Sequence, residues 1–188
     1  MSTLFATVYD RFLGKITDDL YLELTPEDTL RDLQNLLIHS IPGFEFPRKN
    51  LYKYVIKISK IEFADYTEDM GFVVWNHLSE NNEPIAVTVD NSYFEEDLTE
   101  EEINILALLM KTAWVQRQVT SIENTRMKYS GSDFKFTSQA NHLSKLLSLL
   151  AECQRDSHHM QRLYKRRKLD LNGNYISTWA GLNGNGSY

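Results

Sequence analysis

The sequence predicts a mainly α-helical fold: a helical bundle with a long antiparallel helix pair, a small β-insert and an extended C-terminal arm. Three observations predict this class. Long segments carry apolar residues at helical spacing, a stretch between them alternates with the period of a strand, and the end of the chain is rich in Gly and Asn. We therefore expect a helical core domain at 1–50 and 93–169, a β-insert at 51–92 and an arm at 170–188.

The first two helices are predicted from their apolar stripes and their end signals. Residues 3–16 place apolar side chains near one helical face, and Gly14 ends this helix. The second helix has Thr25 as its N-cap, Pro26 at the first helical position and acidic residues in its first turn, and Pro42 stops it. Its expected buried stripe consists of Leu30, Leu33, Leu36, Leu37 and Ile41.

The β-insert is predicted from a change of period. Alternation from Tyr52 to Ser59 and apolar runs at Phe72–Trp75 and Ile85–Val89 indicate short strands, separated by turn residues at 69–71 and 81–84. About 40 residues are too few for an independent core, so a small sheet leaning on the helices is expected.

A helix at Thr99–Glu123 is predicted to be the centre of the core. Thr99 and Glu102 form a capping box, and Leu98 is placed to pack on Ile103. Apolar residues cover nearly every face of its first half, so this half needs neighbours on all sides. Polar residues return from Lys111 onward, which predicts a more exposed second half.

The last helix is expected to pack lengthwise on this central helix. Turn residues at 129–133 separate the two, and Thr137 or Ser138 is the expected cap. Spacings of three and four predict an antiparallel pair with a seam made of Leu143, Leu146, Leu150, Cys153, Ser157, Met160 and Tyr164. The single Cys153 excludes an internal disulfide and is expected to be a buried, inert thiol.

The segment after Leu169 has two interpretations. Alone it lacks the apolar surface needed to order itself, which favours a disordered tail. Its aromatic residues instead suit an extended arm that binds a partner's groove or sheet edge. The candidate partner-binding residues of this arm are Tyr175, Ile176, Trp179, Leu182 and Tyr188.

The charges are segregated along the chain, although the net charge is only -6. Residues 61–110 contain thirteen acids and no Lys or Arg, whereas residues 111–168 carry a net +8. Such runs are often two solvated faces. The alternative is that the acidic face of one subunit meets the basic face of another, head to tail, in a ring or filament.

Catalytic and metal-binding patterns are not found in the sequence. His158 and His159 project about 100° apart on a helix, no Cys or His pair has ligand spacing, and the glycines at 181–186 are not placed between a strand and a helix. The carboxylates lack a basic partner, so we expect neither an enzyme nor a cofactor. Without an apolar run of about 20 residues or a signal peptide, we expect an intracellular protein without a membrane span.

The last helix ends in a cluster of basic residues. These are Arg162, Lys165, Arg166, Arg167 and Lys168. Cations at this end stabilise the helix dipole, and together with a protein contact this is the preferred interpretation. Phosphate contact is the alternative; few aromatic residues are interleaved, so such binding would be weak and salt-sensitive.

Three segments resemble the head-to-tail adaptor (neck or connector) proteins of tailed bacteriophages. They are Val8–Thr17, Phe94–Met110 with the following Trp114, and Ser130–Leu143. The resemblance covers about two thirds of the chain. It implies a mainly helical subunit that forms a dodecameric ring beneath the portal, extends the channel through which DNA leaves, and uses terminal arms to hold the portal or the next tail-completion component. The β-insert is longer than in the simpler adaptors.

The resemblance therefore implies a structural protein of the virion neck that is made in the host cytoplasm, takes part in genome ejection and contacts DNA without reading its sequence. The basic residues would line the DNA channel or a seam between subunits. The alternative is a small helical regulator or nucleic-acid-binding protein that uses Arg162–Lys168. A hydrolase with acids in the insert is disfavoured, because no nucleophile or base accompanies them.

Overall fold

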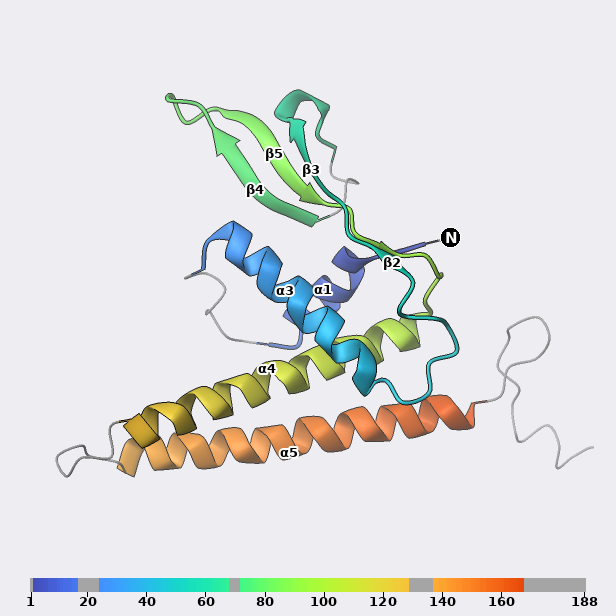
Figure 1. Ribbon diagram of the computed structural model, residues 1–188, viewed down its shortest axis with the longest axis vertical. Helices are drawn as coiled ribbons and strands as arrows, with labels where there is room; N and C mark the ends of the chain where they lie inside the picture. The colour runs from blue at the N-terminus through green and yellow to red at the C-terminus, as the bar shows by residue number, and fades with distance from the viewer. Residues whose placement is uncertain (1, 17–23, 68–71, 129–136, 168–188) are drawn as a thin grey trace, which may run out of the picture.

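The computed structural model describes residues 2–16, 24–67, 72–128 and 137–167 (Figure 1). In these residues the chain forms a mixed α/β fold with two three-stranded antiparallel sheets. The prediction of a mainly α-helical bundle is therefore wrong. Three of the strands are only two residues long, and they form by pairing with distant segments. Two of them, Thr3–Leu4 and Tyr93–Phe94, are too short to show a period in the sequence.

Helices α1 (Phe5–Leu13) and α3 (Pro26–Ser40) have the predicted positions. Gly14 follows α1, and the short 3-10 helix η1 (Ile41–Gly43) follows α3. The α3 stripe is buried as predicted, and both helices pack on α4. Together they place the main hydrophobic core between α1, α3 and the first half of α4.

The N-cap of α3 can be tested directly. The Thr25 hydroxyl accepts a hydrogen bond from the Asp28 amide at 3.2 Å. Because Thr25→Ala removes this acceptor at an exposed helix end, we expect a loss of about 1 kcal/mol in the free energy of unfolding, measured by urea denaturation. Thr25→Ser keeps the hydroxyl and should stay close to wild type. An alanine variant as stable as the serine variant would show that this cap contributes little.

The first sheet joins the N-terminus to the insert. Its strands are β1 (Thr3–Leu4), β6 (Tyr93–Phe94) and β2 (Tyr54–Val55), with β6 in the centre. The Phe94 ring packs on Phe5, with ring centroids 4.7 Å apart, and the Thr3 hydroxyl accepts from the Leu98 amide at 2.7 Å. Residues 3–4, predicted as the first helical turn, are instead a strand because β6 pairs with them.

The second sheet projects from the helices on the side opposite α5 (Figure 1). Its strands, in spatial order, are β3 (Ile58–Glu62), β5 (Pro84–Asp90) and β4 (Phe72–Leu78). The central strand buries Val87 and Val89, and the 3-10 helix η2 (Phe63–Asp65) packs against it. The alternation from Tyr52 to Ser59 predicted one strand, but that stretch is divided between β2 and β3.

Asp90, at the end of β5, fastens this sheet to the helices. Its carboxylate is buried and accepts hydrogen bonds from the Gln34 side chain of α3 at 3.3 Å and from the Ser92 amide at 2.9 Å. Burial raises the pKa of Tyr9 on α1, and the charge of Asp90 and a hydrogen bond with it raise that pKa further. Since these partners come from α1, α3 and the loop after β5, Asp90 fixes where the sheet leaves the core.

Helices α4 (Glu100–Lys128) and α5 (Thr137–Arg166) form a long antiparallel pair (Figure 1). The Thr99 amide donates to Glu102 at 2.8 Å and the Glu102 amide donates to Thr99 at 3.3 Å, which confirms the capping box. The predicted seam of α5 is buried or half-buried throughout. The end predicted near residue 124 was too early, because no helix-breaking residue follows before Lys128.

Candidate protein-interaction surfaces

The basic residues at the end of α5 do not form one patch. The Lys165 ammonium lies 3.7 Å from the centre of the Phe46 ring, and Arg167 pairs with Glu101 of α4 at 2.9 Å. Arg162 and Arg166 are exposed, and Lys168 lies outside the described residues. Two of the five predicted cations are therefore engaged in contacts within the subunit, which reduces the charge available to phosphates.

The loop after α3 is fastened to the same end of α5. The buried Gln161 side chain accepts a hydrogen bond from the Glu45 amide at 2.8 Å and donates to the Gly43 carbonyl at 3.2 Å. Arg48 donates to the Tyr164 carbonyl at 2.8 Å, and its guanidinium carbon lies 4.3 Å from the centre of the Tyr164 ring. These contacts hold the last turns of α5 in one position relative to the core.

A buried carboxylate completes this junction. Glu102 is 1% exposed; one of its oxygens accepts from the Tyr164 hydroxyl and the other from the Thr99 amide. Burial raises the pKa of Tyr164, and its hydrogen bond with Glu102 and the charge of Glu102 raise it further. The phenol therefore stays protonated and donates to the carboxylate, as a buried charge requires.

Folding changes the meaning of the segregated charges. The antiparallel pairing brings the acidic start of α4 against the basic end of α5, and α1 contributes a further cation. Glu100 pairs with Arg11 and Glu101 with Arg167. The two blocks of opposite charge are thus partly neutralised inside one subunit. The acids that remain available for an external contact include those of the projecting sheet.

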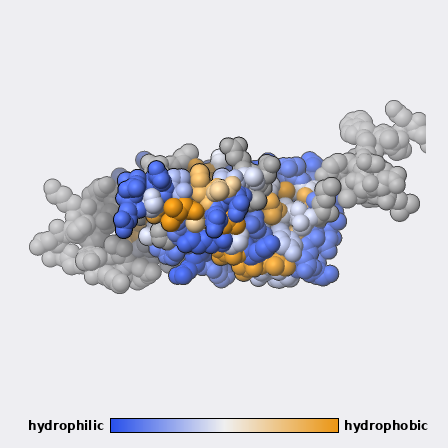
Figure 2. All heavy atoms as spheres, turned by 90° about the horizontal axis from the view of Figure 1, so that it is seen from above, coloured by the Kyte–Doolittle hydropathy of each residue, from blue (hydrophilic) through white to orange (hydrophobic). Residues whose placement is uncertain are grey.

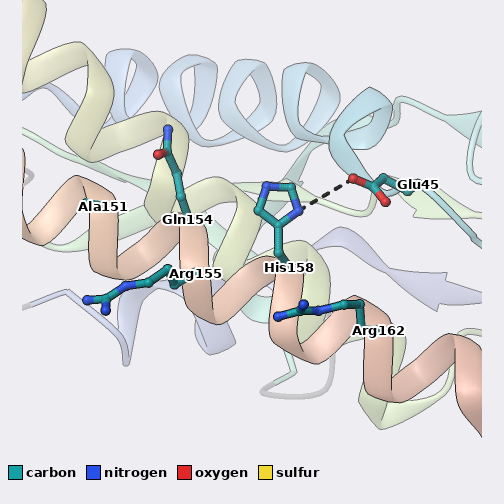
Figure 3. Close-up of a pocket in the computed structure, with 6 residues that line it drawn as sticks. All are labelled: Glu45, Ala151, Gln154, Arg155, His158 and Arg162. Carbon is teal, nitrogen blue, oxygen red and sulfur yellow. Dashed lines mark ion pairs between the residues drawn. The ribbon is translucent and has the colours of Figure 1, made fainter.

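An open cleft of about 600 Å³ lies beside α5 (Figure 3). His158 points toward Glu45, and one of its ring nitrogens lies 3.5 Å from the Glu45 carboxylate, whereas Gln154 extends from an earlier turn of the helix. Arg155 and Arg162 extend along the helix, two turns apart. Arg155 and Gln154 were not among the predicted site residues. The spacing of residues 155, 158 and 162 places them on one helical face, which could have indicated this cleft from the sequence. The contribution of Glu45 could not, because Glu45 is far away in the sequence.

Exposed apolar residues gather on the insert. In the described part of the chain, seven of the ten exposed large hydrophobic residues lie between 51 and 92. They are Tyr52, Ile56, Ile58, Phe63, Val73, Leu78 and Ile85. Seen from above the sheet, apolar side chains interrupt the hydrophilic surface (Figure 2). Such a concentration within one segment of the chain is typical of a contact surface.

Other predicted features have different outcomes. The arm residues Tyr175, Ile176, Trp179, Leu182 and Tyr188 lie outside the described residues. Cys153 is buried as predicted, and burial raises the pKa of its thiol. Within the described ranges, His, Cys, Asp and Glu do not gather in groups of three that could hold a metal ion. None of the helices in those ranges is long and apolar enough to cross a membrane.

Comparison with known proteins adds no relative. No protein-family model, curated protein or solved structure matches this chain significantly. A functional assignment must therefore rest on the surfaces described above and on the residues of the chain itself.

Proposed function

We propose that this chain is a structural virion protein, a head-to-tail connector subunit that forms a ring beneath the portal, extends the DNA channel and joins capsid to tail. Its partners are further copies of itself in a dodecamer, the portal, the next neck or tail-completion protein, and genomic DNA that passes without sequence-specific binding. The proposal places it in the virion neck after synthesis in the host cytoplasm, and it requires neither catalysis nor a cofactor.

The observation that carries this proposal is the concentration of exposed apolar residues on the insert at 51–92, of which Ile58, Val73, Leu78 and Ile85 lie on the projecting sheet. A monomer that works alone rarely exposes its large apolar residues on one element, whereas an assembly subunit buries them against a neighbour. The long α4–α5 pair gives a rigid support, and the resemblance of residues 8–17, 94–110 and 130–143 to connector proteins supplies the kind of assembly.

A nucleic-acid-binding regulator remains the second candidate. Arg155, Arg162 and Arg166 lie on one face of α5, all exposed, at spacings that phosphates could contact. Lys165 and Arg167 are held by Phe46 and Glu101, so the predicted cluster of five is reduced. Binding would be weak and would fall steeply with salt, so DNA-binding measurements across a salt series distinguish this candidate from a connector.

The proposed function is tested with the arm. Mixed with the portal encoded in the same genome, the full chain should attach as a ring visible by electron microscopy. A variant in which 170–188 is replaced by a Gly-Ser segment of equal length should lose attachment, because it lacks the aromatic anchors, while its circular dichroism stays unchanged.

Two results would count against this assignment. Unchanged attachment of the Gly-Ser variant means that the arm has been assigned wrongly. Antibody labelling of purified virions that finds no protein at the neck, together with a monomer whose DNA affinity falls steeply across a salt series, favours the second candidate.

A further inference from the structure

The β4–β5 hairpin ends in a fixed acidic turn. The Ser79 amide donates to the Glu83 carbonyl at 2.7 Å, and the Asn82 amide donates to the Ser79 carbonyl at 2.9 Å. Asn82 adopts a left-handed conformation with φ of 61°, which asparagine tolerates better than most residues. Glu80 and Glu83 are exposed on this turn, so two carboxylates are presented on a preorganised support.

The described lining of the cleft beside α5 has a net positive charge, because it contains two arginines and one acid, Glu45, which lies 3.5 Å from His158. Arg155 and Arg162 line it, with His158 between them. Neither arginine forms an ion pair with another residue in the ranges that the structure describes, and the same holds for Glu80 and Glu83. Within the described part of the chain, two unpaired carboxylates and two unpaired guanidinium groups thus lie on separate surfaces of one subunit.

From this complementarity we propose that the β4–β5 turn of one copy docks into the α5 cleft of a second copy. Glu80 and Glu83 contact Arg155 and Arg162 there, since Arg and carboxylate groups form strong paired hydrogen bonds. Apolar contact is provided by Leu78 and Ile85, which are half exposed beside the turn.

The receiving helix offers a matching apolar side chain. Leu147 is 44% exposed on α5, two turns before Arg155 on the side toward the helix start, and Ala151 lies between them. An apolar centre next to paired charges is the usual composition of a specific interface. A second copy is therefore a better occupant of the cleft than a small anion, which would leave these apolar groups uncovered.

The position of the two surfaces determines the kind of assembly. The hairpin and α5 lie on opposite sides of the subunit (Figure 1). A contact between two different surfaces is heterologous, so it repeats from copy to copy and gives a ring or a filament. This contact rests on the proposed function in that it supplies the subunit seam of the proposed ring, but it can be measured without a portal.

Disulfide trapping detects the contact even when it is transient. In a Cys153→Ala background, Asn81→Cys and Ala151→Cys variants of the full chain are mixed under mild oxidation, and the heterodimer is quantified. We expect a yield at least about tenfold above that of the control pair Glu62→Cys and Lys145→Cys, and a decline at high salt. A yield equal to the control overturns the proposal.

Charge exchange identifies the residues responsible. Adding Glu80→Lys and Glu83→Lys to both trapping variants should lower the yield about tenfold or more, and so should adding Arg155→Glu and Arg162→Glu. When the Asn81→Cys partner carries the two lysine substitutions and the Ala151→Cys partner carries the two glutamate substitutions, the charges are again complementary and the yield should recover. Failure to recover overturns the proposal, provided that circular dichroism shows each variant folded.

A control substitution on α5 tests whether the effect is specific to the cleft, and virion labelling distinguishes failure of the contact from failure of the proposed function. Lys145→Glu with Arg166→Glu makes the same change of charge on α5 outside the cleft and should leave trapping unchanged; an equal loss would contradict a contact in the cleft. Specific trapping of a protein that virion labelling does not find at the neck supports the contact and removes the proposed function. Rings on the portal without specific trapping support the proposed function and overturn the proposed contact.

Discussion

Replacing Tyr164 with alanine is expected to lower the free energy of unfolding by about 3–5 kcal/mol, measured by urea denaturation. The ring is 1% exposed and packs edge-on against Phe44, with centroids 5.5 Å apart, while Arg48 lies over its face. The alanine variant leaves a cavity and also removes the hydroxyl that donates to the buried Glu102 carboxylate. Both losses fall at the junction of α4, α5 and the loop after α3.

Tyr164→Phe separates the two contributions. It keeps the ring in the cavity and removes only the donor, while Glu102 retains its hydrogen bonds from Thr99. We expect a smaller loss of about 1–3 kcal/mol, typical of leaving a buried acceptor without one of its donors. Lys165→Ala, at the exposed neighbouring position, should lie within about 1 kcal/mol of wild type. A phenylalanine variant as unstable as the alanine variant would contradict the role of packing.

Local signals explain why the helices were predictable. Thr25 with Pro26, and Thr99 with Glu102, determine helix starts through contacts within three residues, so a single segment contains all the information. The α5 seam was likewise predictable, because apolar residues that recur every three or four positions indicate a helix that packs on one partner along its whole length. The end of α4 was missed since it depends on the absence of a breaking residue, which is a weaker signal.

The sheets were not predictable to the same degree, because their pairing is non-local. Thr3 and Tyr54 both pair with Phe94. The alternation around Tyr54 predicted a strand there but not its partner, and the two residues of the strand at Thr3 are too few to show alternation. Thr3 and Leu4 were therefore predicted to be part of the helix that follows them. This is the physical reason that the fold class was wrong although the long helices were found.

The same limit applies to the candidate surfaces. A basic cluster can be found by counting residues, but the partners that engage Lys165 and Arg167 are Phe46 and Glu101, which lie far away in the sequence. The structure therefore selects which cations remain available. In the structure Arg162 is exposed and lines a cleft together with Arg155 and with Glu45 from the loop after α3.

Stability is expected to fall steeply above pH 10, by about 2.7 kcal/mol per pH unit from two tyrosines together. Burial and then Asp90 raise the pKa of Tyr9, and burial and then Glu102 raise that of Tyr164, so both phenols keep their protons in the folded state. In the unfolded chain they lose them near pH 10. Above that pH the folded state binds more protons, and the free energy of unfolding decreases as pH rises.

The Tyr9→Phe and Tyr164→Phe double variant isolates this effect from the deprotonation of lysines. Urea titrations at several pH values between 8 and 11.5 should give a slope above pH 10 that is shallower than wild type by about 2.7 kcal/mol per pH unit, because neither phenol remains to titrate. Tyr52→Phe removes a phenol that is exposed to solvent in the folded protein, and this variant should keep the wild-type slope. Parallel curves for the wild type and the double variant would mean that these two hydroxyls already ionise in the folded protein, and that the hydrogen bonds at Glu102 and Asp90 hold less strongly than their burial implies.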